Sequence, residues 1–118
     1  MSWDCSLVDP VTRERLETDK LHDINGGTYC VGGTREMWLN VTYNYGYIFR
    51  KVMPPDGLRT IEGMSGADSI PVLEKAISKL ADNVDKDYWK ATEGNAKRAL
   101  HGLLALAKLR PDGVWELD

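Results

Sequence analysis

Cysteine, histidine and long apolar runs are all scarce in this chain. The sequence has only Cys5 and Cys30, which form no Cys-x-x-Cys pair, and its two histidines are not clustered. Protein metal sites need such ligands at characteristic spacings, so we predict no metal and no cofactor. No window approaches the ~18 apolar residues that span a bilayer, and the first residues lack the basic region and apolar run of a secretory signal. We therefore expect a cytoplasmic protein without membrane contact, in which both thiols are reduced and buried.

Basic residues are too few for a general nucleic-acid-binding domain. The chain carries 15 Lys and Arg against 18 Asp and Glu, a net charge of -3, whereas such domains usually present a basic surface. General nucleic-acid binding is therefore not expected, although local basic patches remain possible. The length of 118 residues and the 42% hydrophobic content predict one domain, residues 1–118, with a compact core.

The aromatic residues are unbalanced, with one Phe against four Trp and five Tyr. Trp and Tyr combine an apolar body with a hydrogen-bonding tip, which suits half-exposed pockets and interfaces. They are also ordinary core residues in small domains that contain β-strands. Composition alone leaves both interpretations open.

Residues 38–51 form the stretch around which we expect the fold to be organised. From residue 38 to residue 44, apolar and polar side chains alternate, which predicts a strand with one buried face. Leu39, Val41 and Tyr43 would point toward the core. The opposite face would carry Trp38, Asn40, Thr42 and Asn44. After Gly46 the apolar spacing becomes helical, so we predict that this strand leads into a short helix.

Further strands are predicted on the N-terminal side of this stretch. Residues 3–8 alternate well enough for a first strand, residues 9–12 are typical of a turn, and residues 13–17 would return as a solvated edge strand. A short strand at 28–31 lies between two glycine pairs of the kind found in tight turns. Residues 35–42 are predicted to be the longest strand, antiparallel to the one before it.

The C-terminal half predicts two longer helices. After an extended piece at 58–61, Asp68 or Ser69 would cap a helix with Pro71 in its first turn and one apolar stripe. An acidic connection follows, and the last helix would run from near Thr92 until an Arg-Pro pair ends it.

This order of elements favours an α+β fold. We predict a small antiparallel sheet in the N-terminal half, with two to three helices packed on one face. The other face of the sheet must be solvated or covered by a partner. Because a small sheet with one exposed aromatic face is stabilised when that face is covered, we expect a homo-oligomer.

A second group of candidate binding residues surrounds the start of the last helix. The first N–H groups of a helix are unpaired and attract anions. The residues that could hold an anion there are Thr92, Asn95, Lys97 and Arg98. Tyr45 and Trp89 could stack on a flat ring. Together with the polar strand face, these residues would suit a planar, anionic ligand. The alternative is that Thr92 only caps the helix and that the basic side chains are solvated.

No arrangement of residues indicates catalysis. His22 lies among charged loop residues, as a ligand contact or as plain surface, and His101 lies beside the apolar stripe of the last helix, where a structural role fits better. Carboxylates and tyrosines are common but form no diagnostic pairing of nucleophile and base. We therefore predict no catalytic residues and favour a binding protein over an enzyme.

Several specific blocks are spread along the chain. They are residues 9–12, 26–29, 38–45, 66–71 and 88–97, among which Asn-Val-Thr-Tyr-Asn-Tyr and Thr-Glu-Gly-Asn-Ala-Lys are the most specific runs. Through these blocks nearly the whole chain resembles a group of small, largely uncharacterised proteins from phages, prophages and bacteria. Short viral proteins of this kind include inhibitors of host defence, and some of those bind and sequester nucleotide immune signals.

The residues and the resemblance together lead to one hypothesis. The chain would be a phage-type, anti-defence protein that binds a nucleotide-derived ligand in the host cytoplasm and sequesters a host immune signal without converting it. One alternative is a protein-interaction module that inhibits a host protein through its Tyr and Trp surface. The other is a small hydrolase that acts on a nucleotide.

Overall fold

The central sheet has three antiparallel strands in the order β4-β1-β5. They are β1 (Ser2–Val8), β4 (Trp38–Thr42) and β5 (Val114–Leu117) in a computed structural model that describes residues 1–28 and 30–118. Cys5 lies opposite Leu39 on one side and opposite Leu117 on the other. A separate two-stranded ribbon pairs β2 (Glu17–His22) with β3 (Thr34–Glu36).

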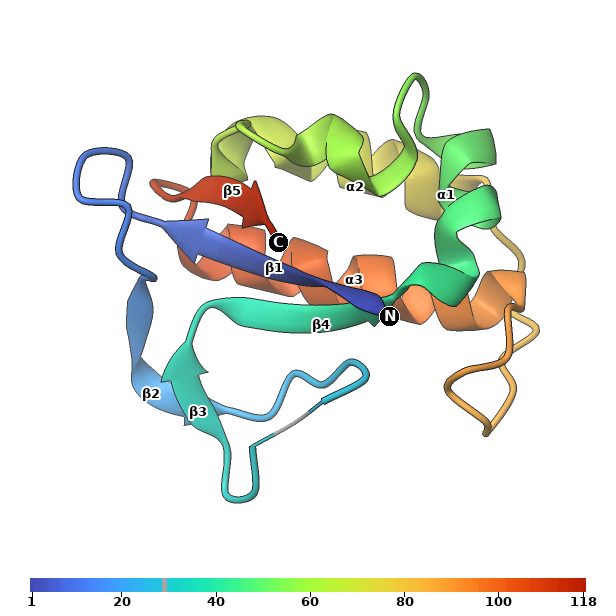
Figure 1. Cartoon of the computed structure of the whole chain (residues 1–118), viewed down its shortest axis with the longest axis horizontal. Coiled ribbons are helices and arrows are strands. Elements are labelled where there is room, and N and C mark those ends of the chain that lie inside the picture. The colour runs from blue at the N-terminus through green and yellow to red at the C-terminus, as the bar shows by residue number, and fades with distance from the viewer. Residues whose placement is uncertain (29) are drawn as a thin grey trace.

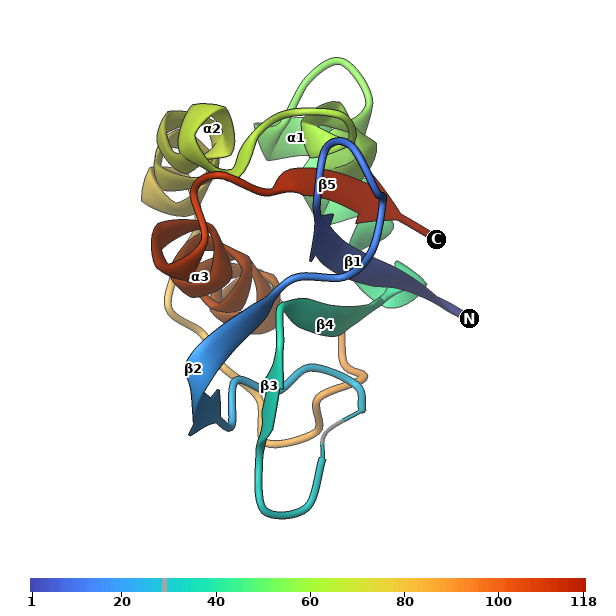
Figure 2. The ribbon, with the colours of Figure 1, turned by 90° about the vertical axis from the view of Figure 1, so that its left-hand side faces the viewer.

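The helices lie on one side of this sheet, as predicted. The two longer ones, α2 (Gly66–Ser78) and α3 (Glu93–Leu109), pack against each other and cover one face, while α1 (Gly46–Val52) closes one end (Figures 1 and 2). Short 3-10 helices at Tyr43–Tyr45 and Gly57–Ile61 flank α1. The predicted α+β class is therefore confirmed, with an antiparallel sheet and helices on one face.

The core fills the space between the sheet and the helices. Because side chains alternate along a strand, Cys5 and Leu7 of β1 share the inward face with Leu39 and Val41 of β4. Burying each such side chain contributes about 1.5–3 kcal/mol. The largest fully buried side chains are Trp115, Tyr45, Phe49, Leu7, Met37, Leu39, Met53, Leu58, Ile61, Leu73, Leu100 and Leu103. The C-terminal segment that contains Trp115 forms strand β5.

The outward face of the sheet is partly covered by the chain itself. Asn40 and Thr42 belong to this face, yet they are only 8% and 1% exposed. The Asn40 amide donates to Ser2 Oγ at 2.7 Å and to Asp4 Oδ1 at 3.0 Å, both on the neighbouring strand. A Cβ added to Gly27 would lie 2.4 Å from Asn40 Oδ1, so the loop of residues 24–28 passes close over this face.

Both edges of the sheet are hydrogen-bonded to loops. On β4, the Asn40 carbonyl accepts from Gly27 N at 2.9 Å and from the Tyr88 hydroxyl at 3.2 Å, and the same hydroxyl accepts from Thr42 N at 3.1 Å. On β5, Trp115 exchanges two backbone hydrogen bonds of 2.9 Å with the loop of residues 63–64. Exposed strand edges promote pairing between molecules, and here the chain occupies both.

Several predicted strands need correction. Residues 13–17 do not return as a strand: the Asp9 carboxylate accepts from Val11 N and Thr12 N, and Arg13 adopts a φ of 64°, so only one bridge with β1 forms. The ribbon strand β2 begins at Glu17 instead, and its remaining residues were not predicted to form a strand. The predicted strand at 28–31 is absent from its described residues, and its Tyr29 lies outside them. The long strand predicted at 35–42 is interrupted at Met37, where the chain passes from the ribbon into the sheet.

The helical predictions were closer. The helix after Gly46, the start of α3 at Thr92 and its end before Pro111 are confirmed. Residues 58–61, predicted to be extended, belong to a 3-10 helix. The cap of α2 is Ser65 rather than Asp68 or Ser69: its Oγ accepts from Asp68 N at 3.0 Å.

The two cysteines are free but differ in exposure. Cys5 is fully buried, and burial raises the pKa of its thiol. Cys30 is only partly buried, so the prediction of two buried thiols was wrong for this one. None of the helices in the described part of the chain is both long and apolar enough to cross a membrane.

Candidate functional site

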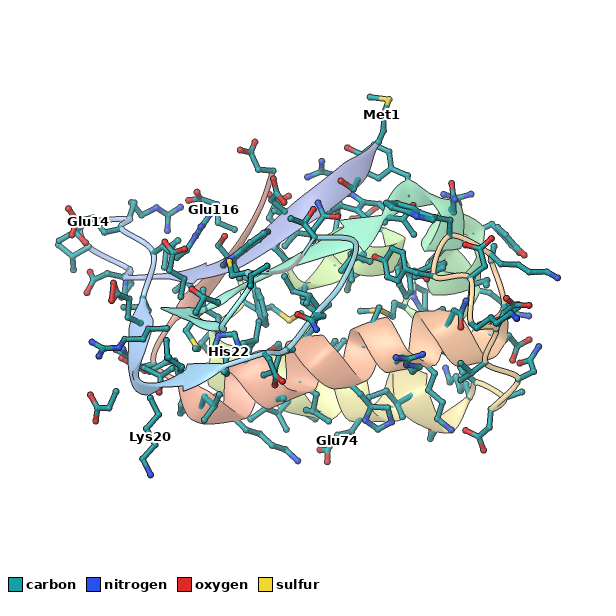
Figure 3. The ribbon with its side chains drawn as sticks, turned by 90° about the horizontal axis from the view of Figure 1, so that it is seen from below. Met1, Glu14, Lys20, His22, Glu74 and Glu116 are labelled. Atoms are coloured by element: carbon teal, nitrogen blue, oxygen red, sulfur yellow. The ribbon has the colours of Figure 1, made fainter. Side chains whose placement is uncertain are left out.

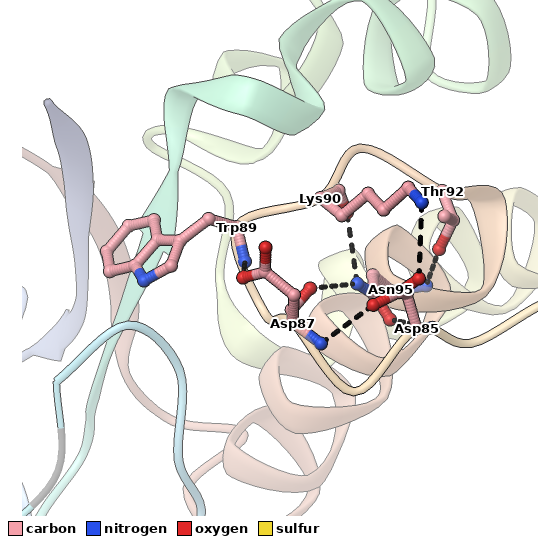
Figure 4. Close-up of polar contacts among 6 residues, drawn as sticks. All are labelled: Asp85, Asp87, Trp89, Lys90, Thr92 and Asn95. Atoms are coloured by element: carbon pink, nitrogen blue, oxygen red, sulfur yellow. Dashed lines mark hydrogen bonds and ion pairs between the residues drawn. The ribbon is translucent and has the colours of Figure 1, made fainter.

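The segment between α2 and α3, residues 81–92, folds around the side chain of Asn95; we call it the connector. Asn95 Oδ1 accepts from Asp85 N at 2.9 Å, and Nδ2 donates to the carbonyls of Asp87 and Lys90, each at 3.0 Å (Figure 4). The residue is only 4% exposed. The oxygen and the nitrogen of the Asn95 amide are therefore both engaged in holding the connector.

The N-terminus of α3 is satisfied by the same segment. Thr92 Oγ1 accepts from Asn95 N at 3.1 Å, and Asn83 Oδ1 accepts from Gly94 N at 3.2 Å. Glu93 Oε1 accepts from Ala81 N at 3.0 Å. The Thr92 and Asn83 side chains take up two of the α3 N–H donors that the sequence had left available to an anion, so Thr92 serves as a helix cap in this structure.

Lys97 is also paired within the chain. Its Nζ donates to Asp82 Oδ1 at 2.6 Å and to the Leu80 carbonyl at 3.3 Å. The hydrogen bond from Lys97 holds the pKa of the Asp82 carboxyl below its usual range. Lys97 therefore fastens the beginning of the connector to α3.

The end of β4 and the start of α3 do meet, through the connector. Asn44 Nδ2 donates to the Trp89 carbonyl at 2.8 Å, while Asn95 binds the carbonyl of the next residue, Lys90. The hydroxyl of Tyr45 donates to the carbonyl of Tyr88. Tyr45 is fully buried, and this burial raises its pKa. The two candidate regions are thus adjacent, and the bonds that join them are internal.

The two candidate tryptophans lie in different surroundings. Trp89 is 51% exposed, its ring meets Tyr88 edge to face with centroids 4.9 Å apart, and it points away from the Asn95 network (Figure 4). Trp38 is largely buried, and the Arg15 guanidinium lies 5.4 Å from its ring centroid. Trp89 is therefore available at the surface, whereas Trp38 lines a small internal cavity.

A concave site of about 290 Å³ lies between residues 24–25 and the face of α3; we call it the candidate pocket. It is lined by Ile24, Asn25, Tyr45, Tyr88, Asn95, Arg98, Ala99, His101 and Gly102. Three of the residues proposed from sequence, Tyr45, Asn95 and Arg98, belong to this lining. Trp38, Asn40, Thr42, Asn44, Trp89, Thr92 and Lys97 do not, although several of them hold the connector that forms one wall.

The polar groups of the candidate pocket favour an anion. Arg98 and His101 are three residues apart on α3, so both side chains lie on one face of the helix, and both are exposed. A guanidinium binds phosphate or carboxylate through two parallel hydrogen bonds. The phenol of Tyr88 forms an aromatic wall, and burial raises its pKa, which keeps it neutral. A cationic side and an aromatic side therefore face one small space.

Asn25 and His101 are polar residues of this pocket that sequence reasoning did not propose. Asn25 falls outside every predicted strand and helix, and His101 was given a structural role. The Arg98-x-x-His101 spacing was the available indication, since it places both side chains on one helical face. What the sequence could not indicate is that the loop of residues 24–28 crosses to face them.

The pocket offers means of binding more clearly than means of catalysis. In the described residues, no group of three or more His, Cys, Asp or Glu is arranged to hold a metal ion. The lining contains one imidazole, and both of its phenols are already hydrogen-bonded to backbone groups. Comparisons of the chain with protein-family models, with curated proteins and with solved structures found no match.

Proposed function

We propose that this chain binds a small nucleotide-derived anion in the candidate pocket and sequesters it without chemical conversion. The observation that carries the proposal is the convergence of Arg98 and His101, from one face of α3, on a pocket walled by Tyr88. A phosphate needs cationic and N–H donors, and a nucleobase needs a flat apolar wall with a nearby amide. All of these groups line one space.

Each residue has a definite part in the proposed complex. The Arg98 guanidinium holds the phosphate through paired hydrogen bonds, and the His101 ring adds a further donor. The ring of Tyr88 contacts the base, while the amide of Asn25 pairs with its edge or with the sugar. Asn44, Thr92 and Asn95 act indirectly, because they fix the connector that carries Tyr88.

The volume of the candidate pocket limits the size of the ligand that it can hold. Its volume of about 290 Å³ lies at the lower end of the ~300–1,000 Å³ range of ligand sites. That space matches one nucleotide unit better than two. We therefore expect a mononucleotide, or one end of a longer nucleotide, to occupy it.

The sequence resemblance supports the biological setting of the proposal. A phage-type protein that removes a nucleotide immune signal from the host cytoplasm needs affinity and abundance but no turnover. A pocket with one phosphate-binding side and one aromatic side is sufficient for that role. Self-association through the exposed aromatic side chains of Tyr43, Tyr47 and Trp89 would increase the number of binding sites in each assembly.

Isothermal titration of monodisperse protein tests the proposal. The ligand set is AMP, ADP-ribose and a cyclic dinucleotide, each titrated into the wild type, R98Q and R59Q. Arg59 is the matched control because it lies on the 3-10 helix Gly57–Ile61, pairs with Glu62 and does not line the pocket. We expect binding that R98Q weakens at least tenfold, about 1.4 kcal/mol, and that R59Q leaves unchanged. No heat with any ligand, or equal affinity in R98Q, would remove the idea.

A second candidate function is protein binding through exposed aromatic side chains. Tyr43, Tyr47 and Trp89 are 39%, 60% and 51% exposed. The Tyr47 hydroxyl donates at 3.3 Å to the carbonyl of Ala91, two residues after Trp89 in the chain. Exposed Tyr and Trp are enriched at interfaces. A pull-down from host lysate, repeated with W89A, tests this: a stable partner lost in W89A, with no small molecule required, favours it over ligand sequestration.

The same proteins and nucleotides that are used in the titration also test the hydrolase alternative. After incubation with protein, a sequestered ligand is recovered unchanged on denaturation, whereas a hydrolase leaves products. Turnover above that of R98Q would replace sequestration by catalysis.

A further inference from the structure

A second recess lies between the chain at residues 21–25 and the turn that contains Gly32 and Gly33. Its volume is about 500 Å³, within the ordinary range of ~300–1,000 Å³ for ligand sites. It is lined by Leu21, His22, Asp23, Asn25, Cys30, Gly32 and Gly33. A small inner cavity of about 10 Å³ adjoins it, since His22, Asp23, Asn25 and Cys30 line both, and Trp38 lines the inner one.

The wall of this recess is firmly built around His22. His22 Nδ1 accepts from Ile24 N at 3.3 Å, and Nε2 donates to the Glu36 carbonyl at 2.7 Å. Both ring nitrogens are thereby hydrogen-bonded within the chain. Gly33 completes the wall: its φ is 87°, and a Cβ there would lie 2.8 Å from the His22 carbonyl oxygen. In Figure 3 Lys20 projects away from the ribbon, whereas His22 lies over the body of the molecule.

The inner cavity contains an unpaired hydrogen-bond donor. Trp38 Nε1 is buried and has no hydrogen-bond partner among the residues that the structure describes. Buried polar groups are nearly always paired with protein or with ordered water, so such a donor indicates a missing partner. A cavity of about 10 Å³ has room for about one water molecule. That water would accept from Trp38 Nε1 and present its own hydrogen atoms toward the recess.

The charges around the recess differ from those of the candidate pocket. No Lys or Arg belongs to its described lining, and the only formal charge there is the exposed carboxylate of Asp23, which accepts hydrogen bonds. The Asn25 amide both donates and accepts. An anion is disfavoured by this lining, whereas an uncharged molecule with a donor beside an acceptor satisfies it.

We propose that the recess is a second ligand site, which shares Asn25 with the candidate pocket but not Arg98 or His101, for a small uncharged molecule of the aminopurine or amide type. Its N–H group donates to Asp23, and its neighbouring acceptor is reached from Trp38 Nε1 through the water of the inner cavity. Adenine carries such a pair, an exocyclic amino group beside a ring nitrogen. Adenine is therefore the probe for the site.

The indole resonances of ¹⁵N-labelled protein test this proposal. The four tryptophans give four Nε1–H signals, and W38F identifies that of Trp38; if W38F does not fold, triple-resonance assignment of the wild type replaces it. We expect a cross-peak from the Trp38 signal to water and a saturable shift of that signal on addition of adenine. D23N should weaken adenine binding at least fivefold, and inorganic phosphate should leave the signal in place.

The outcomes also separate this site from the proposed function. R98Q is expected to bind adenine in the recess as the wild type does, whatever it does to nucleotide affinity in the candidate pocket. A Trp38 signal that adenine does not move, or equal shifts of all four indole signals, would overturn the proposal. Undiminished adenine affinity in D23N would overturn it as well. A water cross-peak without any adenine response would reduce the recess to a hydration site only.

Discussion

Replacing Asn95 tests whether its amide is the main support of the connector. Asn95→Ala removes the three side-chain hydrogen bonds to Asp85, Asp87 and Lys90 from a position that is 4% exposed. At about 0.5–1.5 kcal/mol net for each bond, the loss is about 1.5–4.5 kcal/mol, a large part of the ~5–15 kcal/mol that stabilises a typical domain. Urea denaturation followed by tryptophan fluorescence measures it as a lower midpoint at unchanged slope.

Two further variants sharpen this test. Asn95→Asp keeps the shape and the acceptor but turns a carboxylate oxygen toward two carbonyls, so at pH 7 it should destabilise at least as much as Asn95→Ala. Asn25→Ala removes an exposed amide and should change stability by no more than about 0.5 kcal/mol. If Asn95→Ala cost no more than this control, or if Asn95→Asp matched the wild type, the connector would not depend on this amide.

Three other substitutions test neighbouring contacts. Tyr88→Phe removes the hydroxyl that bridges two backbone groups of the β4 edge and should cost about 1–2 kcal/mol in urea denaturation; no change would mean that the edge does not need it. The Lys97 hydrogen bond lowers the pKa of Asp82 in the folded state. The stabilisation from this bond is therefore fully present above the unfolded pKa of about 3.9, and it is lost as the pH falls through the lower pKa of the folded state. Asp82→Asn should therefore be less stable than the wild type at neutral pH and equal to it in strong acid, and a constant difference in denaturation across pH would contradict this. Gly94→Ala gains about 1 kcal/mol of helix propensity, but its Cβ would lie 2.4 Å from the Val84 backbone nitrogen; we expect a net loss of about 1–3 kcal/mol and a lower melting temperature, and a higher one would refute the clash.

The sequence predicts the helical half of the fold well because periodicity and caps are local. The apolar spacing of α3 and the hydroxyl of Thr92 specify its face and its beginning without knowledge of any other element. The strand β2, by contrast, reads Glu-Thr-Asp-Lys-Leu-His, and no alternation marks it. Its pairing with β3 depends on contacts between chain segments, which a local pattern does not encode.

The candidate site was predictable in type more than in detail. Asn40, Asn44 and Asn95 were predicted to bind a ligand, but a sequence does not show whether an amide pairs with a ligand or with the chain. Each of the three binds internal partners. Arg98 is the proposed residue whose side chain lies in the pocket and is exposed, and its neighbour His101 emerged only when the loop of residues 24–28 was seen to face α3.

The occupied edges of the sheet have a consequence for assembly. For a second molecule to extend the sheet at β4, the Tyr88 hydroxyl would first have to release two backbone groups and the connector would have to open. Fibril-like stacking should then be limited by the rate of that opening, which amide hydrogen exchange at Thr42 reports directly. Self-association of intact molecules would therefore use surface side chains and not the sheet edges. A variant that frees the β4 edge should associate by extending the sheet from one molecule to the next before it unfolds.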